Sequence, residues 1–276
     1  MAIHLGGSSR NSLAVTRDVL DKSLAGLSGD VASSLSNDLF AVVNVLGQNV
    51  ALRRAITDPS RHSEEKAAFL KELLGSRISD KALAIASTAV TQRWSSPSDL
   101  LIAMEQIAIQ AEAGAANARG ELDKLEEEIF SFSRALVANQ DLRNTLNGNP
   151  QVITEKRTLV NEILKGATAS TKALVSQIVN GLWGRSIENA LSDIAHATAE
   201  HRNLVVAHVQ SAIDLTADQK SKLATALSKQ IGQAVRVNVE TNPKVIGGVS
   251  IRFRDELIDG TVISRMADAS QALAGK

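Results

Sequence analysis

The sequence predicts a mainly α-helical protein in which two tandem helical bundles precede a small α+β module. The first observation is compositional, since apolar residues make up 44% of the chain while Tyr is absent and only five Phe and two Trp occur. A core of Leu, Val, Ile and Ala suits closely packed helices better than a sandwich or barrel. The second is an internal repeat with a period of about 90 residues. The third is a change, beyond residue 203, from helical spacing to strand-like alternation of apolar residues.

The first bundle is expected over residues 1–97. Its helices follow from apolar residues that recur on one helical face, with Gly or Pro near their ends. Pro59 stops the third helix, and Pro97 closes the segment. The expected helices cover residues 11–24, 30–46, 49–58, 64–74 and 81–94.

A second bundle, expected over residues 98–202, repeats this series. Matching residues lie 90 positions apart: Leu35 and Leu125, Leu39 and Ile129, Phe40 and Phe130, Leu46 and Leu136, Asn49 and Asn139, Leu52 and Leu142, Arg53 and Arg143, Ile56 and Leu146. Trp94 and Trp183 each stand near the end of the equivalent helix, where a core position is the simpler interpretation. Residues 100–113 are expected to form the first helix of this copy. Residues 113–120 fit either a loop or a weak point in one long helix.

The α+β module is expected over residues 203–276. Strands are predicted at residues 204–209, 235–239, 249–253 and 257–258 from apolar runs or period-2 alternation. A helix follows the first strand, because Thr216 and Gln219 have the spacing of a capping box. The turn at residues 259–261 leads into a last helix that runs to about residue 273. The result is a mixed sheet with two helices on one face.

The clearest family signal lies in residues 245–266. It combines Gly247-Gly248 between aliphatic residues, an alternating strand, an Asp259-Gly260-Thr261 turn and a helix that carries Arg265. This combination resembles the C-terminal signature of the delta subunit of F-type ATP synthases, the oligomycin-sensitivity-conferring protein family. The resemblance covers residues 98–276 directly, and residues 1–97 only through the internal repeat. The extra copy is similar to that of the longer forms known in actinobacteria.

The resemblance implies a non-catalytic subunit of the peripheral stalk, one subunit within a hetero-oligomer. In that family the helical domain holds N-terminal segments of the alpha subunits, and the C-terminal module holds the C-terminal ends of the b subunits. The subunit thereby stops the catalytic head from rotating. The expected location is the cytoplasmic face of a bacterial cell membrane, without insertion into the bilayer. Because the repeat preserves its apolar register, we expect the extra bundle to lengthen the stator and to offer a second contact, to a b subunit or to the head.

The family pattern also nominates residues for these contacts. A groove for an alpha-subunit segment would lie between the first and fifth helices of the second copy. Its candidates, each equally compatible with the chain's own core, are Ile107, Ala111, Leu174, Ile178 and Leu182. The candidates in the C-terminal docking module are Gly247, Gly248, Arg252, Arg254, Asp259 and Arg265. The two strand arginines fit either ordinary surface charge or pairing with acidic residues of a partner.

Composition and motifs weigh against other classes of function. Thirty basic residues balance 30 acidic ones and aromatic residues are few, so no nucleic-acid partner is expected. No run of about 18 apolar residues is present to span a membrane. The chain lacks Cys, which excludes disulfides and thiolate ligands. A helical adaptor or chaperone unrelated to the synthase, and an enzyme that uses the α+β module, are the alternatives.

No motif predicts a catalytic, cofactor or metal site. Gly247-Gly248 leads into a strand and lacks the Lys of a phosphate-binding loop. The spacing of His196, Glu200 and His201 differs from that of a zinc-binding His-Glu-x-x-His helix. If Asp259 acted as a general base with His208 as its partner, the site would also need a nucleophile or a substrate pocket, and the sequence indicates neither.

Overall fold

A computed structural model of the chain describes residues 5–148, 153–213, 215–231, 234–242, 248–253 and 256–259. The chain divides into two compact units, residues 1–201 and residues 202–276. We call them the helical unit and the C-terminal unit and describe each by itself.

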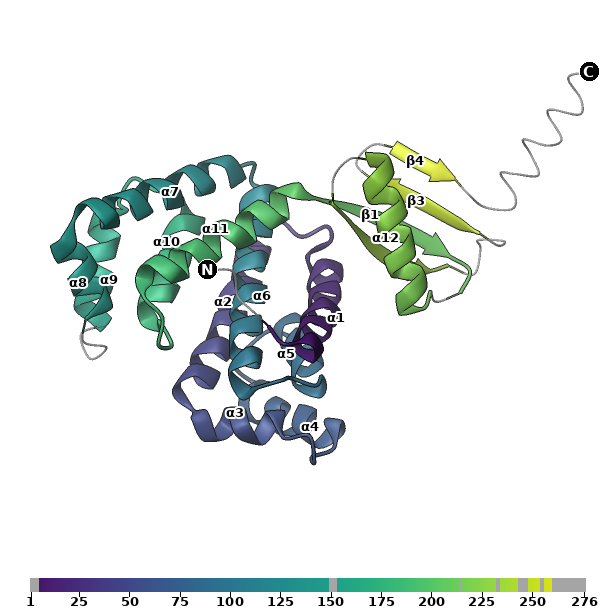
Figure 1. Ribbon diagram of the computed structural model, residues 1–276, viewed down its shortest axis with the longest axis horizontal. Coiled ribbons are helices and arrows are strands. Elements are labelled where there is room, and N and C mark those ends of the chain that lie inside the picture. Colours follow the sequence, from purple (N-terminus) through teal and green to yellow (C-terminus); the bar gives the residue numbers. More distant parts are fainter. Residues whose placement is uncertain are drawn as a thin grey trace, which may run out of the picture. The chain divides into compact units, whose positions relative to one another are not determined.

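The described part of the helical unit contains α1 to α11 (Figure 1). Their bounds are α1 Gly7–Leu24, α2 Gly29–Gln48, α3 Val50–Thr57, α4 Ser63–Leu74, α5 Asp80–Thr91, α6 Pro97–Ala118, α7 Leu122–Ala138, α8 Gln140–Asn147, α9 Ile153–Ile163, α10 Ala169–Asn180 and α11 Ile187–Asn203. The helices predicted for the first copy are all present, with ends that differ by a few residues. Pro97 begins α6 instead of merely closing a segment, since a helix needs no N–H donor in its first turn.

Helix α6 connects the two copies of the repeat. It continues through Ala118, so the helical interpretation of residues 113–118 is the correct one, and the turn follows at Arg119 and Gly120. Gly120 has a φ of 70°, which a residue without a Cβ adopts at little cost. Helix α6 contacts α1, α2, α3 and α5 of the first copy, and α7 and α10 of the second. One continuous apolar core therefore contains residues of both copies.

The internal repeat of the sequence is also visible in the structure, where the two copies make equivalent contacts. In the first copy, Asp38 on α2 accepts a hydrogen bond of 2.8 Å from the backbone N–H of Ser79, the residue before α5. In the second copy, Glu128 on α7 accepts one of 2.9 Å from the N–H of Thr168, the residue before α10. Asp38 and Glu128 stand 90 positions apart. The core-facing residues of α2 and α7 are likewise buried as equivalent pairs: Leu35 and Leu125, Leu39 and Ile129, Leu46 and Leu136.

The C-terminal unit contains a four-stranded sheet in the order β2-β1-β3-β4. Its elements are β1 Leu204–Ser211, α12 Ala217–Ile231, β2 Ala234–Thr241, β3 Val249–Phe253 and β4 Glu256–Asp259. Strands β1 and β2 are parallel, whereas β1–β3 and β3–β4 are antiparallel, so the predicted mixed sheet is confirmed. The predicted last helix lies outside the described residues.

Helix α12 covers one face of this sheet (Figure 1). It begins with the predicted capping box, in which Thr216 Oγ1 accepts from the N–H of Gln219 and Gln219 Oε1 accepts from the N–H of Thr216. Leu227 packs into an apolar cluster with residues of the strands. Alternate residues of β2 are buried there, because successive strand side chains point to opposite faces: Val235, Val237 and Val239.

Candidate functional site

The predicted partner groove lies between α6 and α10, the first and fifth helices of the second copy. Four of its five candidate residues have an exposed fraction of 0%: Ile107, Ala111, Leu174 and Ile178. The fifth, Leu182, is half-buried. Helix α2 lies along α6 and also contacts α10, and α6 and α10 contact each other directly. These side chains form part of the chain's own core, so a partner helix would contact the four buried ones only if neighbouring elements moved away. Their role in binding a partner stays a prediction.

Small residues allow α2 to lie close to α6. The hydroxyl of Ser36 donates a hydrogen bond of 2.9 Å to the backbone carbonyl of Ala108. A Cβ on Gly29 would lie 3.0 Å from the carbonyl oxygen of Ala115 and closer still to the side chain of Arg119. Larger residues at these positions of α2 would force the helices apart.

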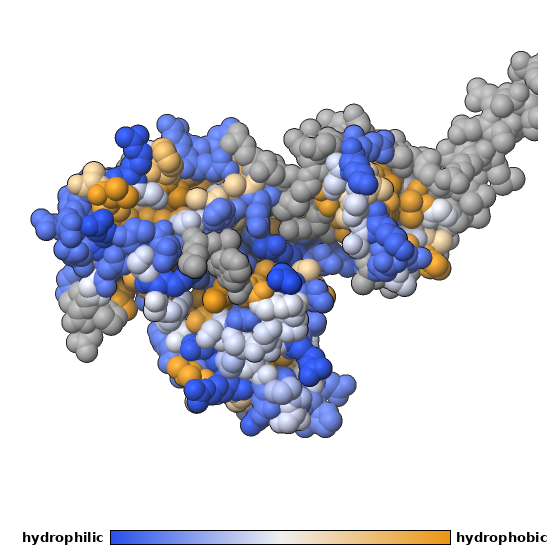
Figure 2. Space-filling model, viewed as in Figure 1, coloured by the Kyte–Doolittle hydropathy of each residue, from blue (hydrophilic) through white to orange (hydrophobic). Residues whose placement is uncertain are grey.

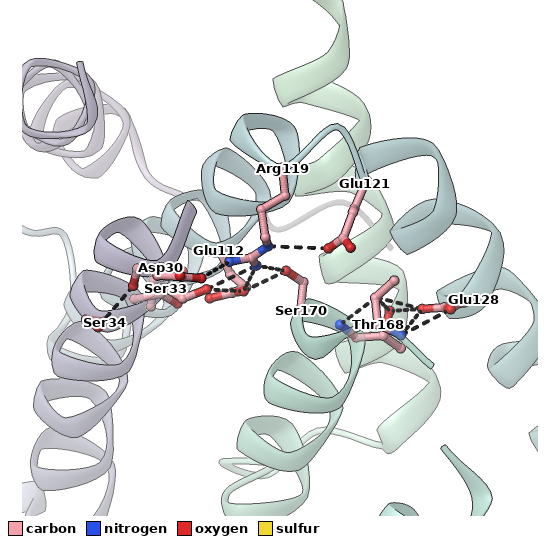
Figure 3. A network of polar contacts seen from close by, with 12 residues as sticks. Asp30, Ser33, Ser34, Glu112, Arg119, Glu121, Glu128, Thr168 and Ser170 are labelled. Carbon is pink, nitrogen blue, oxygen red and sulfur yellow. Dashed lines mark hydrogen bonds and ion pairs between the residues drawn. The ribbon is translucent and has the colours of Figure 1, made fainter. Parts of the chain in front are cut away.

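A polar network centred on Arg119 joins α2, α6 and α10 at one end of the groove (Figure 3). The guanidinium donates to Ser170 at 2.7 Å and to Ser33 at 3.2 Å. It also pairs with Glu112 at 3.3 Å. The carboxylate of Glu112 is 1% exposed and accepts 2.7 Å hydrogen bonds from the hydroxyls of Ser33 and Ser170. A buried carboxylate is tolerated only with such partners, so the network fixes α2 against the second copy.

The contact of Glu128 with the N-terminus of α10 affects the pKa of Glu128. Burial raises the pKa of Glu128, but hydrogen bonds from Thr171 and Thr168 lower it more, so its pKa lies below the ordinary value of 4.5. A carboxylate at a helix N-terminus faces the free N–H groups of the first turn. Glu128 on α7 therefore stabilises α10 in its position as an ion (Figure 3).

A buried ion-pair cluster joins α6 to the segment after α10. Arg185 contacts Glu105 at 2.5 Å and Asp193 at 2.6 Å. Burial raises the pKa of Glu105 to about 7, although the Arg185 charge acts in the opposite direction. Burial also raises the pKa of Asp193, against the same Arg185 charge.

The cluster borders a cavity of 220 Å³ that is also lined by Arg53 and Trp183. Arg53 is held by the backbone carbonyls of Leu46 and Gly47 at 2.6 and 2.9 Å. Sequence inspection missed this site, because Glu105 and Arg185 stand 80 positions apart and no spacing rule connects them. Trp183 lies partly buried against Gly47 of α2, in agreement with the expected core role.

The docking-module candidates are described only in part. Gly248 precedes β3 with a φ of 77°, a backbone conformation that favours glycine. Gly247, Arg254 and Arg265 lie outside the described residues. Arg252 on β3 stands opposite His208 of β1, and Asp259 on β4 stands opposite Ser250. Whether these residues contact a partner stays a prediction.

The chemical alternatives find little support in the described residues. Strand β3 separates His208 on β1 from Asp259 on β4, which weighs against an acid–base pair. Glu200 is engaged by Arg17 at 3.2 Å and by Gln110 at 3.3 Å, so it holds α11 against α1 and α6. No group of three or more His, Cys, Asp or Glu is placed to hold a metal ion within the described ranges. None of the helices described is long and apolar enough to cross a membrane.

Comparisons with known proteins identify the family. The model of the family described as "ATP synthase delta (OSCP) subunit" matches residues 110–273. A protein of Streptomyces coelicolor named ATP synthase subunit delta is 37% identical over 97% of this chain and 98% of its own length. Proteins of the same name from Parafrankia sp. and Thermobifida fusca are 38% and 35% identical over 97% and 98% of this chain, and over 99% of their own lengths. The first copy of the repeat therefore has counterparts in these relatives, although the family model begins within α6. The chain belongs to the ATP synthase delta (OSCP) subunit family.

Proposed function

We propose that this chain is the non-catalytic peripheral-stalk subunit of an F-type ATP synthase, which connects the catalytic head to the membrane-anchored b subunits and resists rotation of the head. The observation that carries the proposal is the similarity over 97% of the chain to proteins named ATP synthase subunit delta. An unrelated helical adaptor, the alternative function, would not account for that similarity. The location that follows is the cytoplasmic face of a bacterial cell membrane.

We assign one kind of partner to each unit. The helical unit is proposed to hold N-terminal segments of the alpha subunits, and the C-terminal unit the C-terminal ends of the b subunits. Support comes from the division of the chain into two compact units, each with its own apolar core. Two attachments on one chain also raise the effective concentration of each, so contacts of modest affinity hold jointly.

A stator must transmit torque without bending, and the helical unit has features that suit this task. Its two copies share α6 and one core instead of meeting at a flexible linker. The Arg119 network and the Arg185 cluster add charged contacts between segments far apart in the sequence. Deleting residues 1–97 would remove α2 from α6 and uncover buried apolar residues, so experiments on the function of the first copy require the full chain.

The test uses the purified full-length chain and two binding partners, an alpha-subunit N-terminal peptide and the cytoplasmic part of a b subunit. Amide hydrogen exchange is measured with each partner alone. We expect the alpha peptide to slow exchange within residues 1–201 and the b fragment to slow it within residues 202–276. Protection in the opposite units would refute the assignment. Failure of a tagged chain to co-purify with alpha, beta and b subunits from membranes would favour the unrelated adaptor.

A further inference from the structure

Helices α2 and α7 carry a second stripe of residues beside the one that faces their own bundle. On α2 this stripe contains Ser36, Phe40, Val43 and Gly47. The α7 residues 90 positions later are Glu126, Phe130, Ser133 and Val137. The spacing of four, three and four residues places each set on one side of its helix. The core-facing stripes of the two helices are buried alike, and their N-cap contacts match, so the second stripes are equivalent in position.

The two second stripes differ in their surroundings. On α2, Ser36, Phe40 and Val43 are 1%, 3% and 1% exposed. The second copy covers them, since Ser36 bonds to the Ala108 carbonyl of α6 and the Trp183 ring lies over Gly47. Within the helical unit, the second stripe of α2 therefore packs against α6, on a different side of α2 from its core-facing stripe.

On α7 only part of the equivalent stripe is exposed, because Glu126 and Ser133 are half-buried. Phe130 is 63% exposed and Val137 is 70% exposed, although Phe130 corresponds to the buried Phe40. Figure 2 shows apolar surface between charged groups in the region that Figure 1 labels α7. Arg134 extends over Phe130, with its guanidinium carbon 6.0 Å from the ring centroid. The stripe from residue 130 to residue 137 is about 10 Å long, two turns of helix.

We propose that the exposed part of the α7 stripe, Phe130 and Val137, binds an amphipathic α-helix of another polypeptide in the complex. The occupant presents small or aliphatic residues to Phe130 and Val137. It carries a carboxylate that faces Arg134, because a cation beside an apolar stripe favours an acidic partner. Val137 replaces Gly47 of the first copy, so the helix lies directly on this end of the stripe with no aromatic lid above it. The inference rests on the proposed assembly into the synthase, but not on which subunit supplies the helix.

The test exploits the absence of Cys from the chain. Val137→Cys places a single thiol on the stripe, and Ala135→Cys places one on the same helix but on another exposed side, since residues two apart do not share a face. Each variant is alkylated with a maleimide, first as the free chain and then within the purified synthase. We expect assembly to slow alkylation of the Val137→Cys thiol by about tenfold or more relative to the control.

A benzophenone attached to the same thiol then identifies the occupant. Crosslinking to a helical segment of another subunit, with apolar residues spaced three and four apart, is the expected result. Equal alkylation of the two thiols in the assembled complex would overturn the inference. So would a crosslink to a second copy of this chain, to lipid or to a non-helical segment. A chain that never enters the complex would instead count against the proposed function, which separates the two failures.

A substitution provides an independent readout. Val137→Asp is expected to lower the amount of chain that assembles with the complex by about tenfold, whereas Ala135→Asp should leave it nearly unchanged. Both positions are exposed, so the folded state should tolerate either Asp. Equal incorporation of the two variants would contradict a contact at the stripe.

Discussion

Replacement of Glu105 by Gln should change how the stability of the helical unit depends on pH. Glu105 is 4% exposed and contacts Arg185 at 2.5 Å. Burial nevertheless dominates and raises the pKa of this carboxyl group from 4.5 to about 7. Between these two pH values the folded protein keeps a proton that the unfolded chain has released. The free energy of unfolding therefore falls as pH rises through this range, and the contribution of this group is largest below pH 4.5.

The size of the effect follows from the two pKa values. Because one pKa unit corresponds to about 1.4 kcal/mol, ionisation of Glu105 costs the folded state about 3 kcal/mol more than the unfolded state at pH well above 7. Gln has a similar shape and does not ionise, so Glu105→Gln removes this dependence. The variant should gain stability relative to the natural protein as pH rises from 5 to 8.

Tryptophan fluorescence during urea unfolding measures this difference. Both tryptophans lie in the helical unit, so their emission reports that unit alone. Unfolding curves of the natural protein and of Glu105→Gln are compared at several pH values from 5 to 8. The difference in unfolding free energy should change by about 2.5 kcal/mol between pH 5 and pH 8, most of the full effect. A difference that stays constant would show that Glu105 remains ionised beside Arg185, and would refute the reasoning.

Three further contacts are tested by four substitutions, one of which is a control. Arg119→Met leaves the buried carboxylate of Glu112 without its charged partner and should lower the free energy of unfolding by about 3 kcal/mol in urea. The control Arg143→Met loses a 3.7 Å pair between partly exposed groups and should lower it by at most about 1 kcal/mol. Equal losses would contradict the role of the network. Gly47→Val introduces the residue that the second copy has at this position and places its side chain against the Trp183 ring. We expect the free energy of unfolding to fall by about 1–3 kcal/mol and the tryptophan emission to change. Unchanged emission would argue against the contact. Thr216→Ala removes the N-cap of α12 and should speed amide exchange in that helix by about fivefold, which corresponds to about 1 kcal/mol. Exchange in the helical unit should not change. Exchange of α12 at the natural rate would show that the cap does not stabilise this helix.

Much of the fold and of the family assignment follows from local sequence. The helices of the first copy follow from apolar periodicity with Gly and Pro at their ends, because these features act over a few residues. The capping box at Thr216 and the alternation in β2 predict the start of α12 and the buried face of β2 in the same way. The repeat is visible because equivalent core positions retained the same residue types.

Which surfaces meet depends on contacts between segments far apart in the sequence. Phe40 and Phe130 have the same residue type and the same place in the repeat. Phe40 is buried because α2 packs along α6, whereas Phe130 on α7 is 63% exposed. The candidate groove residues could equally have been exposed or buried, and packing of the chain's own helices buries four of the five. Glu105 and Arg185 form a pair through packing of α6 against the segment after α10. Such contacts depend on long-range packing, which local periodicity does not encode.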